Sequence, residues 1–142
     1  MSTVDVRARV QALLTKHESI AVGTDGVFSI RNESTRVFVR VYDWRDGQST
    51  LVSIFAPVLV DASPSAALDS YVARHADDYV FGHLSIFDND AGTVDVFLSH
   101  MLLGDHLDEP ELMNAVYGVA SSANALDDEL ASTFGGRVFH GV

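Results

Sequence analysis

The 142-residue sequence contains no cysteine, which excludes disulfide bonds, a thiolate nucleophile and cysteine-ligated zinc. Basic residues are also scarce: nine lysines and arginines stand against twenty aspartates and glutamates, so the formal net charge is −11. Proteins that bind nucleic acids neutralise phosphates with clusters of lysine and arginine. The composition therefore predicts that nucleic acid is not a partner.

Long apolar runs are missing as well. No stretch approaches the roughly 18 apolar residues of a membrane span, and the N-terminus carries Asp5, Arg7 and Arg9 where a secretory signal would be apolar. We therefore expect a cytoplasmic protein that does not bind a membrane. Apolar residues nevertheless make up 47% of the chain. This content and the absence of a linker predict one domain over residues 1–142 with a single core.

One long amphipathic helix is predicted from Asp108 to Phe134. Apolar residues recur at steps of three or four from Leu112 onward, so they share one helical face. Asp108 is the expected N-cap, and Glu111 is expected to close a capping box. The two glycines after Phe134 supply the left-handed residue that ends a helix. Because a helix this long needs a surface to pack on, the rest of the chain is expected to form one.

The remaining sequence predicts two shorter helices and five strands. Ser63 and Pro64 are typical of the cap and first position of a helix, and Asp46-Gly47 is typical of a tight hairpin. Short turns between neighbouring strands imply an antiparallel sheet with helices on one face, which is a two-layer α+β domain of order α-β-β-β-α-β-β-α. The expected ranges are helices at 3–16 and 64–76 and strands at 27–31, 36–44, 50–60, 79–87 and 93–101.

The densest polar cluster precedes the long helix and contains His100, Asp105, His106, Asp108, Glu109 and Glu111. Imidazole and carboxylate groups bind zinc or manganese. One hypothesis is therefore a metal-assisted hydrolase that uses His100, Asp105, His106 and Asp108. The spacing matches no zinc motif such as His-Glu-x-x-His, and helix caps and solvated loop residues explain the same cluster. We therefore expect no bound metal, no other cofactor and no catalytic residue.

The order of the elements and the C-terminal stretch resemble the YbjN-type and type III secretion chaperone-like (CesT-like) proteins. The most specific part is residues 102–136, above all Ala125-Leu126-Asp127-Asp128-Glu129-Leu130 and the closing Phe134-Gly135-Gly136. The resemblance implies a small acidic α+β domain, often a homodimer, that binds polypeptide segments of partner proteins without catalysis. A chaperone- or adaptor-like protein is thus the leading hypothesis. An immunity-type interaction protein, without a peptide groove, is a further alternative.

An edge strand can accept a strand from a partner polypeptide. The strand at 27–31 is short and bounded by polar turns, so we expect it to be an edge. Trp44 ends the next strand beside a hairpin, where an exposed indole would contact a partner. The residues expected to contact a peptide are apolar ones of these two strands: Phe28, Ile30, Phe38, Tyr42 and Trp44. From the resemblance, Leu68, Tyr71 and Val72 are expected at a homodimer interface.

Overall fold

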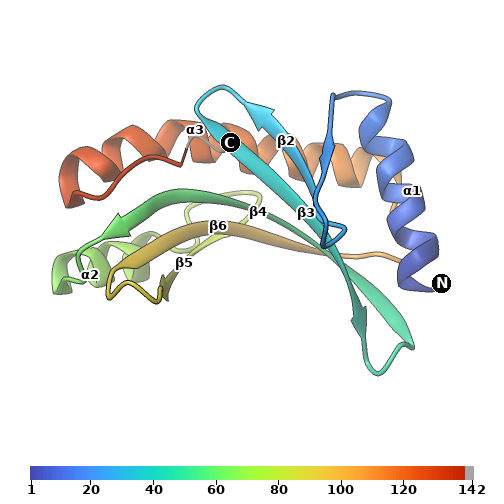
Figure 1. Cartoon of the computed structure of the whole chain (residues 1–142), viewed down its shortest axis with the longest axis horizontal. Helices are drawn as coiled ribbons and strands as arrows, with labels where there is room; N and C mark the ends of the chain where they lie inside the picture. Colours follow the sequence, from blue (N-terminus) through green and yellow to red (C-terminus); the bar gives the residue numbers. More distant parts are fainter. Residues whose placement is uncertain (140–142) are drawn as a thin grey trace.

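The computed structural model describes residues 1–139 and contains one open antiparallel sheet with three helices (Figure 1). The six strands lie in the order β1-β2-β3-β4-β6-β5. The strands are β1 (Ala21–Val22), β2 (Phe28–Asn32), β3 (Thr35–Trp44), β4 (Ser49–Ala62), β5 (His83–Asp88) and β6 (Val94–Leu103), and the helices are α1 (Thr3–Thr15), α2 (Ala66–His75) and α3 (Glu109–Phe134). The predicted α+β class and element order are confirmed, with one additional strand.

The additional strand is β1, which has only two residues, both exposed. It pairs Ala21 with Ser29 and Val22 with Phe28. The prediction that residues 27–31 form an edge strand is therefore wrong, because β1 lies outside β2 in the sheet. The two edges of the sheet are β1 and β5.

The helix ends follow local capping. In α3 the Asp108 carboxylate accepts the backbone N–H of Glu111 at 2.9 Å, as predicted for the N-cap. The predicted start of α2 is wrong: Ser65 is the cap, and its Oγ accepts the N–H of Leu68. The reason is that β4 continues to Ala62, so Ser63 and Pro64 only connect the two elements.

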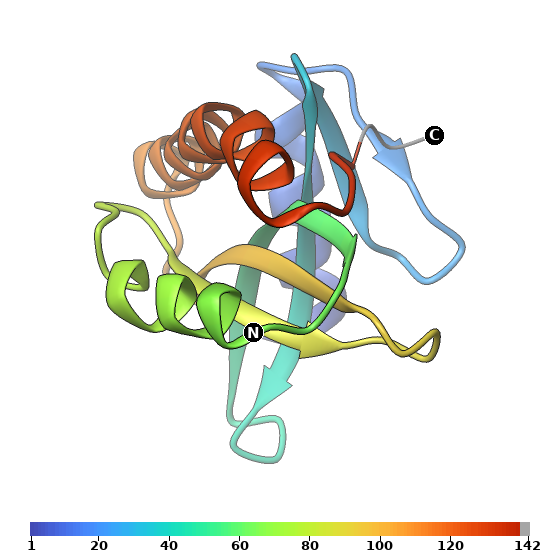
Figure 2. The ribbon, with the colours of Figure 1, turned by 90° about the vertical axis from the view of Figure 1, so that its left-hand side faces the viewer.

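The core lies between the sheet and the helices. Strand alternation turns Val37, Val39 and Val41 of β3 toward the helices, where they meet the apolar faces of α1 and α3. Each fully buried side chain of this size contributes about 1.5–3 kcal/mol relative to exposure. Figure 2 shows α2 and α3 on the same side of the sheet. Within residues 1–139, one face of the sheet is thus covered by helices and the other carries none.

None of the helices within residues 1–139 combines the length and the apolar content needed to cross a bilayer.

Candidate peptide-binding face

The side of the sheet that faces away from the helices carries aromatic and aliphatic side chains. In β3, Phe38, Arg40 and Tyr42 alternate with the buried valines. The strand register places Phe38 opposite Phe55, and Phe55 opposite Ser99. We call this surface the open face. It consists of Phe38, Arg40, Tyr42 and Trp44 of β3, Leu51, Ser53 and Phe55 of β4, Phe87 of β5, and Phe97, Ser99, Met101 and Leu103 of β6.

Four phenylalanine rings form a row across four strands of the open face. Phe38 and Phe55 are stacked, with their centroids 5.4 Å apart and their planes at 16°. Phe97 meets Phe55 edge to face at 6.2 Å and meets Phe87 in the same way at 5.4 Å. Such aromatic pairs contribute about 0.5–1.5 kcal/mol beyond the area that they bury. The row therefore holds a continuous apolar strip in place from β3 to β5.

Two arginines of β3 add positive charge to this side of an acidic protein. The Arg40 guanidinium lies 5.8 Å from the Tyr42 ring centroid and 5.9 Å from that of Phe55, and its Nη2 is 3.5 Å from Asp25. An exposed ion pair of this kind contributes little to stability. Arg36 donates from Nη1 to Ser29, and its buried Nε has no hydrogen-bond partner among residues 1–139. Cation–π contacts thus orient Arg40 over the aromatic row.

The open face is hollowed in two neighbouring places. One cavity of about 280 Å³ is lined by Arg40, Tyr42, Ser53, Phe55, Phe87, Phe97 and Ser99. A second cavity, of about 370 Å³, lies toward β1 and is lined by Ala21, Val22, Gly23, Asp25, Val27, Ser29, Arg36, Phe38, Arg40 and Phe55. Both cavities are lined by Arg40 and Phe55 and therefore adjoin; we call the two together the groove.

The structure divides the residues predicted to contact a peptide. Phe38, Tyr42 and Trp44 lie on the open face, where Tyr42 is 38% and Trp44 is 48% exposed. Phe28 and Ile30 lie on the opposite face, with exposures of 1% and 3%, and belong to the core. A partner cannot reach these two side chains while the domain is folded, because the helices cover them.

The residues predicted at a dimer interface lie mostly inside the chain. Leu68 and Val72 of α2 are buried in the hydrophobic core. The Tyr71 ring packs on His75 at 4.4 Å and on Phe134 of α3 at 5.4 Å. Leu68 and Val72 therefore hold α2 against the domain and are not accessible to a second copy.

The polar side chains that precede α3 have different partners in the fold. Asp108 caps α3. Asp105 accepts a 2.6 Å hydrogen bond from Thr50, which is the main cause of its lowered pKa. His100 faces the helix side beside Phe81, and burial, followed by the charge of His83, lowers its pKa. His106 is exposed. Within residues 1–139 no three histidine, aspartate or glutamate side chains lie close enough to hold a metal ion, so the arrangement required by the hydrolase hypothesis is missing there.

These features define an α+β domain with one helix-covered sheet face and one exposed apolar face. Over residues 4–141 the chain matches the family described as T3SS (YopN, CesT) and YbjN peptide-binding chaperone 1, and it belongs to this family. No curated protein of similar sequence was found. The resemblance stated from the C-terminal stretch is confirmed, and with it the chaperone-like, protein-binding role.

Proposed function

We propose that the open face binds an extended segment of a partner polypeptide and that the protein acts without catalysis. The observation that carries this proposal is the row of phenylalanines, flanked by large apolar side chains that remain exposed on the same face. These flanking residues are Tyr42, Trp44, Met101 and Leu103, with Leu103 62% exposed.

Contiguous apolar surface of this kind is rare on a protein that has no partner. Each square ångström of apolar area that a partner covers contributes about 25 cal/mol. The groove suits an extended chain, because its two cavities are shallow and lie side by side across the strands. The groove also favours a peptide-binding chaperone over the immunity-type alternative, which requires none.

A phage-displayed library of random 12-residue peptides tests this function. Peptides selected on the wild-type protein are expected to contain aromatic and aliphatic residues. They should lose binding to the Phe55→Ala, Phe97→Ala double variant in a fluorescence anisotropy titration. Tyr117→Ala is the matched control, because Tyr117 is 41% exposed but belongs to α3, away from the open face. Selected peptides that bind the double variant as well as the wild type would contradict the proposal.

A cytoplasmic location and a homodimer stay predictions. Leu68 and Val72 are buried in the core of the chain, so of the three predicted interface residues only the partly buried Tyr71 could contact a second copy. Light scattering during size-exclusion chromatography measures the mass directly.

A further inference from the structure

The chain returns to the sheet after α3. Gly135 and Gly136 have φ angles of 74° and 77°, which reverse its direction. Arg137 then pairs with β4: its N–H donates to the Val60 carbonyl at 2.8 Å, and its carbonyl accepts the Val60 N–H at 2.9 Å. In Figure 2 this segment, in red, runs past the end of β4, in green. It forms a one-residue antiparallel strand.

The position of this strand is left free by β3. The pairing of β3 with β4 extends from Trp44 opposite Ser49 only as far as Phe38 opposite Phe55. Beyond Phe55 the strands separate, and the other edge of β4 is paired with β6. Arg137 therefore pairs with the part of β4 that β3 leaves unpaired, on the side of β4 where β3 lies.

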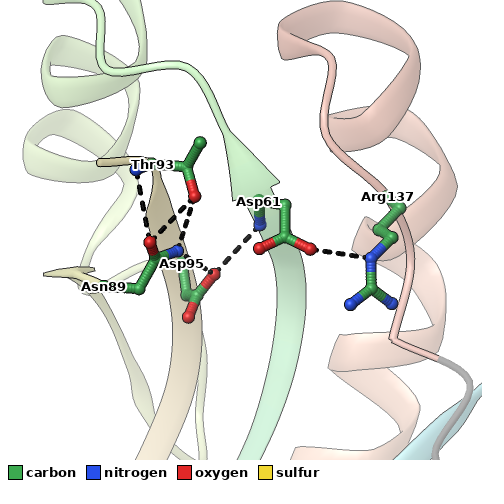
Figure 3. A network of polar contacts seen from close by, with 5 residues as sticks. All are labelled: Asp61, Asn89, Thr93, Asp95 and Arg137. Atoms are coloured by element: carbon green, nitrogen blue, oxygen red, sulfur yellow. Dashed lines mark hydrogen bonds and ion pairs between the residues drawn. The ribbon is translucent and has the colours of Figure 1, made fainter. Parts of the chain in front are cut away.

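The Arg137 side chain is held by a polar network, shown in Figure 3. Its Nε donates to Asp61 at 2.8 Å. The Asp61 N–H donates to Asp95 at 3.0 Å, and Asp95 also accepts from the Asn89 amide at 3.2 Å. Asp61 has a φ of 56°, an uncommon conformation for a residue other than glycine. The network thus presents a fixed carboxylate to a basic side chain.

Phe139, two residues after Arg137, reaches the aromatic row. Its ring centroid is 6.0 Å from that of Phe38, and the planes are inclined at 51°. Side chains two positions apart in an extended segment point to the same side. Arg137 and Phe139 therefore contact the Asp61 carboxylate and the Phe38 ring at the same time.

We propose that residues 137–139 are a ligand of the open face supplied by the chain itself, and that partner segments with the same chemistry displace them. That chemistry is a basic residue that pairs with β4 at Val60 and with Asp61, followed two positions later by an aromatic residue that packs on Phe38. The proposal rests on the proposed function and names the partner class, a basic-x-aromatic segment. A basic segment also suits a chain of net charge −11.

Residues 137–139, which we call the tail, are held weakly enough to be displaced. The tail is held by two backbone hydrogen bonds to Val60, one ring contact with Phe38 and one ion pair with Asp61. In this ion pair the side chains of Arg137 and Asp61 are 65% and 46% exposed. When a binding site is occupied by its own chain, a ligand can bind only the molecules whose site is open. Its apparent affinity is then the intrinsic affinity multiplied by the fraction of open sites. Removal of one aromatic contact is expected to raise that affinity about 3- to 10-fold.

The test uses the full-length protein and a fluorescein-labelled peptide, Phe-Gly-Gly-Arg-Val-Phe-His-Gly-Val, which repeats residues 134–142. In fluorescence anisotropy titrations the Phe139→Ala protein is expected to bind this peptide about 3- to 10-fold tighter than the wild type. Arg137→Ala is a second variant that leaves Phe139 in place, and it should also bind tighter. Val138→Ala is the control and should match the wild type, since the proposal assigns no contact to that position.

The peptide itself is varied in the same experiment. Peptides with alanine in place of the residue equivalent to Arg137 or Phe139 should bind the Phe139→Ala protein at least about 3-fold more weakly. Equal affinity of wild type and both tail variants for the peptide, or no binding to any of them, would overturn the proposal. The proposed function would survive either result if library peptides still bind in a Phe55-dependent manner, so the two failures are distinguishable.

Discussion

Ser34, in the turn between β2 and β3, donates a 2.5 Å hydrogen bond to the Asp127 carboxylate in α3. Asp127 is 1% exposed, so this charge lies inside the domain. The neighbouring Asn124 donates to Asn32 at 2.6 Å, which makes a second link between the same elements. A buried carboxylate is costly unless it is hydrogen-bonded. These contacts therefore fix the β2–β3 hairpin to the long helix.

Asp127→Ala is expected to lower the free energy of unfolding by about 1–3 kcal/mol, because it leaves the Ser34 side chain without its main acceptor. Urea denaturation followed by circular dichroism measures the change. Asp128→Ala is the matched control: Asp128 is the next residue of α3 but is exposed, so a change within about 0.5 kcal/mol is expected. Equal losses for both variants would contradict this role of Asp127.

Phe28→Ala and Phe55→Ala should separate stability from binding. Phe28 is fully buried, so its truncation should cost about 3–5 kcal/mol of unfolding free energy. Phe55 is half-buried on the open face, so its truncation should cost less and should remove peptide binding. Urea denaturation and anisotropy titrations with a library-selected peptide measure the two properties. A Phe28→Ala protein that stays as stable as the wild type would contradict the assignment of Phe28 to the core.

Gly118→Ala should destabilise the domain although alanine favours helices by about 1 kcal/mol. A Cβ at Gly118 would lie 2.5 Å from Cδ2 and 3.0 Å from Cβ of Phe81. Phe81 cannot move away by rotation alone, because the close contact includes its Cβ. Overpacking of this kind costs about 1–3 kcal/mol. In thermal unfolding the Gly118 change should cost less in a Phe81→Ala background than in the wild type, because Phe81→Ala removes the contacts with Cδ2 and Cγ and leaves only the 3.0 Å contact with Cβ.

His100 should make stability depend on pH. Burial lowers the pKa of His100 below 6.5, the value expected in the unfolded chain. Between these two pKa values the unfolded state binds more protons, so stability falls as the pH is lowered from about 6.5. His100→Gln should remove this part of the dependence. Urea denaturation from pH 7.5 to 5.0 measures it, and parallel curves for wild type and variant would contradict the expectation.

Much of the fold could be predicted because several local signals agree. The start of α3 is marked by an N-cap and its length by apolar periodicity, and both agree with the structure. β1 could not be predicted, since Ala21 and Val22 are too few to show alternation, and their pairing with β2 depends on contacts distant in the chain. The start of α2 was missed because Pro64 follows a strand that extends to Ala62, and Ser65 then takes the cap.

The candidate site was predictable only in part. Alternation in β3 separates Phe38 and Tyr42 from Val37 and Val39, as the structure confirms. Alternation does not reveal which face the helices cover, so Phe28 was grouped with residues of the other face. Phe55, Phe87 and Phe97 were missed because their proximity depends on the order of strands in the sheet. The contact of Phe139 with Phe38 has no sequence signal, because it depends on where β3 and β4 separate.

The open face also affects how the protein behaves in concentrated solution. Two copies with exposed aromatic rows would attract each other face to face. A net charge of −11 opposes this attraction over the Debye length, which is about 10 Å at 0.1 M salt. At 1 M salt the Debye length falls to about 3 Å, while apolar attraction persists. The acidic surface thus opposes face-to-face contact of two open faces at low salt, and this opposition weakens as salt is added.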